Sequence, residues 1–267
     1  MSDFDRNAAA AQYGAPLTRA EAAVVDEGLR AYMLRIYNYM VLGLAITGFA
    51  ALGIYMLSVT SDPTLAYQGA RPLARGMYLT QLGYYLFASP LKWVVILAPL
   101  GLVFFLSFRI QNMRPATAQI TFWIYAALVG VSLGSIFLVY THSSITRVFF
   151  ITAATFGALS LWGYTTKRDI SGWGSFLFMG LVGICIAMLV NVFLASTMMQ
   201  WIISVIGVLV FAGLTAYDTQ RLKTEYMYGA MEGEVLERSA IMGALTLYLD
   251  FLNLFTMLLS LLGTRDE

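Results

Sequence analysis

Two aspartates near the carboxyl end of the chain are the residues best placed to do chemistry. Asp250 is the single ionisable residue in the apolar run Ile241 to Leu262, which is long enough to form one membrane-spanning helix. It falls near the middle of that helix, where an unpaired carboxylate costs about 2.5–3.5 kcal/mol. We therefore expect Asp250 to be protonated or to face a partner or water, and an ion or proton site is the usual role of such an acid. The alternative is an Asp that only joins neighbouring helices through hydrogen bonds.

Asp218 follows another apolar run, Met198 to Tyr217, which we predict to be the sixth span. A connection over Gln220 to Ala240 would make spans six and seven antiparallel neighbours. Asp218 would then lie at the cytoplasmic end of span six, and it could approach Asp250 only if its helix ends inside the bundle. Two carboxylates in a low-dielectric place cannot both ionise at low cost, so the pair would titrate as a unit. Such a pair could sense protons, bind a hard cation or act as an aspartyl hydrolase dyad.

Two further side chains are candidates for the same site. Asn253 lies three residues after Asp250, on the same helical face, and could line an ion path. Arg109, near the cytoplasmic end of the predicted second span, could be a gating counter-ion for Asp218; its alternative role is an arginine that extends to the membrane surface. Calcium prefers carboxylate and carbonyl oxygens, but two carboxylates are too few for a tight cage. Asp218 and Asp250 would therefore hold a permeating Ca²⁺ only transiently.

Composition assigns the chain to the membrane class. Its 267 residues are 59% hydrophobic and 12% charged, against about 25% charged in ordinary soluble domains. The net charge of +1, with no basic stripe, argues against nucleic acid as a partner. Cys185 and His142 are the only cysteine and histidine, so we expect no disulfide, no zinc cluster and no Ser-His-Asp or Cys-His site. No cofactor is expected either.

Seven apolar runs predict an all-α integral membrane protein with seven transmembrane helices. Residues 1–35 would form a cytoplasmic tail in which Thr18 to Glu21 resembles a capping box, followed by an amphipathic helix or simply the first turns of span one. Residues 36–267 would form a single transmembrane domain. Met77 to Phe87 is too short to cross, so we expect it to be interfacial or re-entrant, and Gly130 with Gly134 allows close helix approach. The predicted spans are 36–59, 93–110, 118–140, 148–164, 173–194, 198–217 and 241–262.

Basic residues in the connections predict the orientation, because cytoplasmic loops are enriched in Lys and Arg. We count ten basic residues on the amino-terminal side and five on the other, which predicts a cytoplasmic amino terminus. The ten are Arg19, Arg30, Arg35, Arg109, Arg114, Lys167, Arg168, Arg221, Lys223 and Arg238; the five are Arg71, Arg75, Lys92, Arg147 and Arg265.

Two motifs carry a resemblance to a known family. Ala216-Tyr217-Asp218-Thr219-Gln220, followed by Leu247-Tyr248-Leu249-Asp250-Phe251-Leu252-Asn253-Leu254-Phe255, resembles the Bax inhibitor-1 (transmembrane Bax-inhibitor-motif) family in its bacterial branch, over roughly residues 35–263. The resemblance implies a helical bundle with the seventh span central and a calcium leak controlled by a pH-sensitive aspartate pair, which Asp218 and Asp250 match. The family's gate arginine on the second span matches Arg109, with Arg114 as the neighbouring choice.

The expected function is a pH-regulated cation leak channel for Ca²⁺, in the bacterial inner membrane, with lipid, Ca²⁺ and protons as partners. Some bacterial relatives are linked to restraint of a membrane protease, so a modulator of another membrane protein is the alternative. An aspartyl intramembrane protease is a weaker one, because presenilin-type enzymes carry Gly-x-Gly-Asp where this chain has Leu247-Tyr248-Leu249-Asp250. We therefore do not expect an enzyme.

Overall fold

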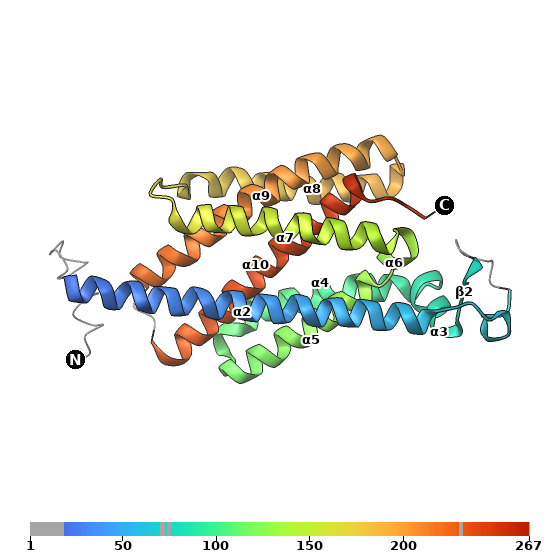
Figure 1. Cartoon of the computed structure of the whole chain (residues 1–267), viewed down its shortest axis with the longest axis horizontal. Helices are drawn as coiled ribbons and strands as arrows, with labels where there is room; N and C mark the ends of the chain where they lie inside the picture. Colours follow the sequence, from blue (N-terminus) through green and yellow to red (C-terminus); the bar gives the residue numbers. More distant parts are fainter. Residues whose placement is uncertain (1–18, 70–72, 74–75, 230–231, 267) are drawn as a thin grey trace. The chain divides into compact units, whose positions relative to one another are not determined.

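The computed structural model describes residues 19–69, 73, 76–229 and 232–266 (Figure 1). Within these residues, seven helical segments are long and apolar enough to cross a membrane, which confirms the predicted all-helical, seven-span architecture. The predicted tail 1–17 and the Thr18 cap lie outside the described residues. The helices are α2 (Arg19–Ser58), α4 (Lys92–Arg109), α5 (Pro115–Leu133) continued by α6 (Ile136–Val139), α7 (His142–Thr165), α8 (Gly174–Leu194), α9 (Thr197–Tyr228) and α10 (Gly233–Leu262).

The chain divides into two compact units, which are described separately. Unit 1 comprises Met1–Met40 and Thr152–Met257, and so holds the first part of α2, most of α7 and α10, and all of α8 and α9. Unit 2 comprises Val41–Ile151 and Leu258–Glu267. The two aspartates singled out by the sequence thus belong to unit 1, and Arg109 belongs to unit 2.

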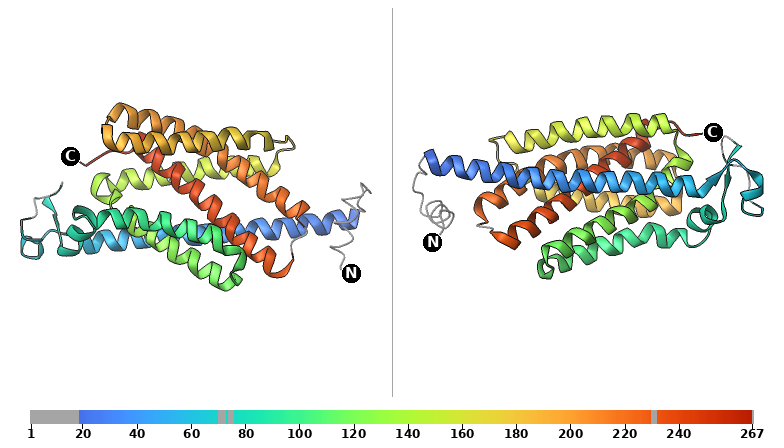
Figure 2. Two further views of the ribbon diagram at one scale, coloured as in Figure 1. Left: turned by 180° about the vertical axis from the view of Figure 1, so that it is seen from behind. Right: turned by 60° about the horizontal axis from the view of Figure 1, so that its bottom comes forward.

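Small residues bring the helices of unit 1 close together. A side chain at Gly163 of α7 would meet the backbone carbonyl of Ala216 in α9, and one at Gly213 of α9 would meet Leu177 of α8. The helices α8 and α9 accordingly lie side by side (Figure 2). Lipid gives helices no hydrophobic reason to associate, so close backbone packing of this kind is what holds them together. Of the seven spans, α10 has the largest buried share, 50% of its most apolar stretch.

The helix α2 runs without a break from the predicted amphipathic segment into the first span. Its side chains at Leu29, Tyr32 and Ile36 are buried. The Tyr32 ring stacks on Tyr226 of α9 with 5.1 Å between centroids, and its hydroxyl lies 2.9 Å from Ser239 Oγ of α10. This stretch of α2 therefore packs on α9 and α10 inside unit 1.

Unit 2 contains the long connection between the first two spans. The strands β1 (Val59–Thr60) and β2 (Tyr78–Leu79) pair antiparallel, and two short helices follow, α3 (Gln81–Gly83) and the π-helix η3 (Tyr84–Ala88). None of these elements is long enough to cross a bilayer. Short 3₁₀ turns complete the chain at η1 (Pro63–Leu65), η4 (Ile110–Asn112) and, in unit 1, η5 (Ser171–Trp173).

Gly130 of α5 and Gly134, which directly follows that helix, pack against α2 within unit 2. A side chain at Gly130 would meet the Thr47 carbonyl, and one at Gly134 would meet Ile54. In addition, Thr47 Oγ1 donates a hydrogen bond to the carbonyl of Ala126, 2.9 Å away on α5. The predicted close approach at this small-residue pair is confirmed.

The sixth span ends later than predicted, and this changes the position of Asp218. The sequence analysis ended that span at Tyr217 and placed a connection over Gln220 to Ala240, whereas α9 continues to Tyr228 and α10 begins at Gly233. The polar residues that follow Tyr217 are mostly good helix formers, so the helix continues where its hydrophobicity ends. Asp218 therefore lies inside a helix and not at the start of a loop.

Candidate functional site

Asp218 and Asp250 lie on buried faces of α9 and α10. Leu214 and Leu222, four residues before and after Asp218, share its face and are buried, and Asp218 itself is 7% exposed. Asp250 is 5% exposed, and Leu254, four residues further along the same face of α10, is fully buried. Both acids are therefore held largely away from water within unit 1.

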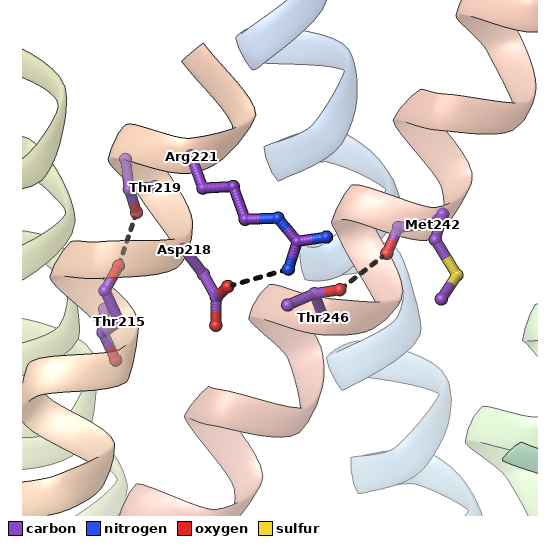
Figure 3. A network of polar contacts seen from close by, with 6 residues as sticks. All are labelled: Thr215, Asp218, Thr219, Arg221, Met242 and Thr246. Atoms are coloured by element: carbon purple, nitrogen blue, oxygen red, sulfur yellow. Dashed lines mark hydrogen bonds and ion pairs between the residues drawn. The ribbon is translucent and has the colours of Figure 1, made fainter. Parts of the chain in front are cut away.

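An arginine accompanies Asp218 on the same helix. Arg221 lies three residues further along α9, and its Nη1 is 3.8 Å from Asp218 Oδ1 (Figure 3). The Arg221 side chain is 63% exposed and that of Asp218 only 10%. In this ion pair a largely exposed guanidinium therefore meets a buried carboxylate. Figure 3 shows the guanidinium extending from α9 toward α10, where Thr246 lies.

The side chains of Asp218 and Asp250 lie close enough for each to act on the other. Ionised carboxylates only accept hydrogen bonds, so a hydrogen bond between the two acids would require a proton on one of them. Because Arg221, 3.8 Å from Asp218, favours a negative charge there, such a proton would sit on Asp250 and its O–H would donate to Asp218. The structure thus brings together the two acids that the sequence singled out.

One oxygen of Asp250 lacks a hydrogen-bond donor. Asp250 Oδ2 is buried and has no hydrogen-bond partner among the described residues. A buried polar atom without a partner costs about 1–3 kcal/mol, so this oxygen is a point at which a proton, water or cation would be stabilised. Asn253, one turn further along α10, is half-buried. Its backbone carbonyl accepts a hydrogen bond from Thr256 Oγ1 at 3.0 Å.

Hydroxyl groups anchor the opposite face of α9. Tyr37 of α2 lies 2.6 Å from Ser160 of α7, and Ser160 lies 2.9 Å from Thr219 of α9, in each case between the side-chain oxygens. Thr219 Oγ1 in turn donates to the Thr215 carbonyl at 2.7 Å. Figure 3 shows Thr215 and Thr219 on the side of α9 away from Asp218. Hydrogen bonds therefore hold α9 on one face, and Asp218 lies on the other.

The other predicted counter-ion lies elsewhere in the chain. Arg109 is in the last turn of α4, and Arg114 comes directly before α5; both belong to unit 2. A pairing of Arg109 with Asp218 stays a prediction. Arg221, which the sequence analysis counted only as a loop cation, is the residue that it missed. Its three-residue spacing from Asp218 would have indicated the pair if α9 had been expected to continue.

The pair has few neighbours that could bind a metal. Within the residues that the structure describes, no group of three or more His, Cys, Asp and Glu side chains is placed to hold a metal ion. Tight calcium sites use six to eight oxygens. Two carboxyl groups therefore suit brief contact with a passing cation better than stable binding.

Comparison with known proteins identifies relatives along nearly the whole chain. Residues 29–267 match the family described as "Inhibitor of apoptosis-promoting Bax1". An uncharacterized protein of Rickettsia prowazekii (strain Madrid E) is 46% identical over 252 residues, which cover 94% of this chain and 96% of that protein. The Escherichia coli (strain K12) inner membrane protein YbhL is 43% identical over 239 residues, which cover 89% of this chain and 93% of YbhL. An uncharacterized protein of Caulobacter vibrioides is 41% identical over 267 residues, which cover both chains fully. With its seven spans, the chain is a multi-pass membrane protein.

Proposed function

The chain belongs to the Bax inhibitor-1 family, and on that premise we propose that it is a pH-regulated cation leak pathway with Ca²⁺ as the cation. The observation that supports this proposal is that two buried acids, Asp218 and Asp250, lie close enough to interact, beside Arg221. A buried, proton-sharing acid pair changes its charge with pH. Its place between two spanning helices lets that change act on a path across the membrane.

In the closed state the acid pair holds one proton and one negative charge. The Asp250 O–H donates to Asp218, and the remaining charge on Asp218 attracts Arg221. The Asp250–Asp218 hydrogen bond joins α10 to α9 at this depth, and Arg221, on α9 itself, balances the charge that remains. Because both acids are buried, the contacts also exclude water from the space between the two helices.

Acidification adds the second proton and removes the last negative charge. Asp218 then no longer attracts Arg221, and the charged link at this point of α9 is lost. Water that enters between the helices would solvate the protonated carboxyl groups. Their carbonyl oxygens would still offer ligands to a passing Ca²⁺, with Asn253 one turn further along the path.

Calcium release from liposomes that contain the purified protein tests this proposal. We expect release to increase as the pH falls from about 8 to about 5, the range in which we propose that the buried acid pair gains its second proton. A switch operated by one proton can change the open fraction by at most about tenfold per pH unit. Release no faster than from protein-free liposomes at every pH would contradict the leak and favour a modulator of another membrane protein.

We further propose that the amino terminus is cytoplasmic, on the basis of the ten-to-five bias in basic residues. Since seven spans place the two ends of the chain on opposite sides, a periplasm-active reporter fused after Thr264 should give signal. The same reporter inserted at Gly233, the first residue of α10, should not. The reverse pattern would overturn this orientation and place Arg221 on the outer side.

A further inference from the structure

Arg221 also lines a cavity whose wall is strongly basic. The cavity, of about 870 Å³, lies between residues 166–171 and the last turns of α9, all within unit 1. Its lining contains two more cationic than anionic side chains, in a chain whose whole net charge is only +1. The cations are Lys167, Arg168, Arg221 and Lys223, and the acids are Asp169 and Glu225.

One side chain of α9 fixes the loop that forms this wall. Gln220 Oε1 accepts a hydrogen bond from the backbone N–H of Ile170 at 2.9 Å, and Gln220 Nε2 donates to the Arg168 carbonyl at 2.8 Å. The Ser171 backbone N–H donates to Asp169 Oδ1 at 2.9 Å and lowers the pKa of that carboxyl. The charge of Asp169 is therefore engaged within its own loop, and the loop backbone is tied to the residue next to Arg221.

The cations of the cavity differ in how far they are already engaged. Lys223 Nζ donates to the Tyr164 carbonyl at 2.9 Å and lies 5.5 Å from the centre of the Tyr164 ring. Arg221 is shared with Asp218. Lys167 and Arg168 are exposed, and neither makes an ion pair within the part of the chain that the structure describes. Lys167 and Arg168 are thus available to bind an anion, and Arg221 can also move toward a bound anion.

The position of the cavity along the spans indicates which anions reach it. Residues 166–170 connect two spans, one ending at Thr165 and the next beginning at Ser171. A connection of this kind lies at the depth of the lipid headgroups. Guanidinium and ammonium groups bind phosphate oxygens through charge-assisted hydrogen bonds. A phosphate group, on an anionic lipid or on a soluble molecule, fits this position and charge.

We propose that the cavity lined by Lys167, Arg168, Arg221 and Lys223 binds a phosphate-bearing anion, and that this anion competes with Asp218 for Arg221. The second part rests on the proposed leak function. An anion that draws Arg221 into the cavity weakens the link between Arg221 and the acid pair. By thermodynamic linkage, loss of the charge on Asp218 strengthens binding of the anion to the same degree. With the anion bound, cation flux would therefore begin to rise at a higher pH than without it.

Lipid binding tests the first part of the proposal without reference to flux. The protein is reconstituted into phosphatidylcholine nanodiscs with increasing phosphatidylglycerol, and the retained phosphatidylglycerol is counted by native mass spectrometry. Arg168→Gln should weaken retention about tenfold, the effect of losing one hydrogen bond to a charged group. Arg114→Gln removes an arginine that is also exposed but lies outside the cavity, and it should leave retention unchanged. Equal retention by the two variants would overturn the site.

The source of the phosphate and the link to Arg221 need two further measurements. If millimolar inorganic phosphate displaces the lipid, the site serves a soluble phosphate compound; if the lipid stays bound, the site serves a lipid headgroup. Added phosphatidylglycerol should move the flux–pH curve of the unaltered protein to higher pH and leave that of Arg168→Gln in place. An unshifted curve in the unaltered protein would refute the competition for Arg221. Absence of any flux would refute the leak and the competition together, while the binding measurement would still decide the site.

Discussion

Replacing Asp218 with Asn is expected to leave Ca²⁺ flux high and nearly independent of pH. The amide is neutral at every pH, so Arg221, 3.8 Å away in the unaltered protein, loses the charge that it pairs with. The variant therefore imitates the fully protonated acid pair, which we assign to the open state. Calcium release from liposomes at several pH values between about 5 and 8 would show a raised, flat profile in place of a rise on acidification.

Replacing Asp250 with Asn should have the opposite effect, although the substitution is the same. The Asn amide can donate a hydrogen bond to the Asp218 carboxylate, as the protonated Asp250 does. Asp218 keeps its charge and its pairing with Arg221, so the closed state persists and flux stays low. The two variants serve as controls for each other, since each removes one carboxylate of nearly equal burial. A flux–pH curve that keeps its shape in both would show that the pair is not the proton sensor.

The same assay distinguishes the two arginines. If Arg221 balances the charge of Asp218 in the closed state, Arg221→Ala should raise flux at neutral pH, because it leaves a buried charge without a partner. The family resemblance predicts that effect for Arg109→Ala. Unchanged flux in Arg109→Ala together with raised flux in Arg221→Ala would show that Arg221, and not Arg109, balances the charge of Asp218 in the closed state.

Adding one methyl group at Gly163 is expected to be the most damaging small change in unit 1. A Cβ atom at this position would meet the backbone of Ala216, two residues before Asp218, and backbone atoms cannot move aside as a side chain can. Gly163→Ala should therefore destabilise the protein by about 1–3 kcal/mol, the usual effect of overpacking. Thermal unfolding in detergent measures this loss.

A glycine six residues earlier on α7 supplies the control. A Cβ atom at Gly157 would have no atom within 4 Å. Gly157→Ala should therefore be neutral or stabilising, because Ala is favoured over Gly inside helices by about 1 kcal/mol. Equal melting temperatures for the two variants would contradict the close packing of α7 on α9.

The number and order of the membrane spans could be predicted almost entirely from sequence. Long apolar runs have one stable solution in lipid, a helix that satisfies its own backbone hydrogen bonds, so seven runs mean seven spans. Where a helix ends is a different matter. Hydrophobicity changes at Tyr217, but α9 continues through Gln220, Arg221 and Lys223 to Tyr228, because helix formation in water depends on propensity and on contacts with neighbouring segments.

For the site, the sequence alone determined which acids matter, because a carboxylate such as Asp250 inside an apolar run is costly without a partner. Their proximity, the pairing of Asp218 with Arg221 and the hydrogen bonds of Gln220 to a loop about fifty residues earlier were decided only by the tertiary structure. The physical reason is the difference between local and long-range effects. The free energy of transfer from water to lipid depends on each residue separately and can be predicted from the sequence. A hydrogen bond or ion pair depends on distances of a few ångströms between segments that are far apart in the chain. Those distances are set by packing, as where Gly163 admits the backbone of Ala216.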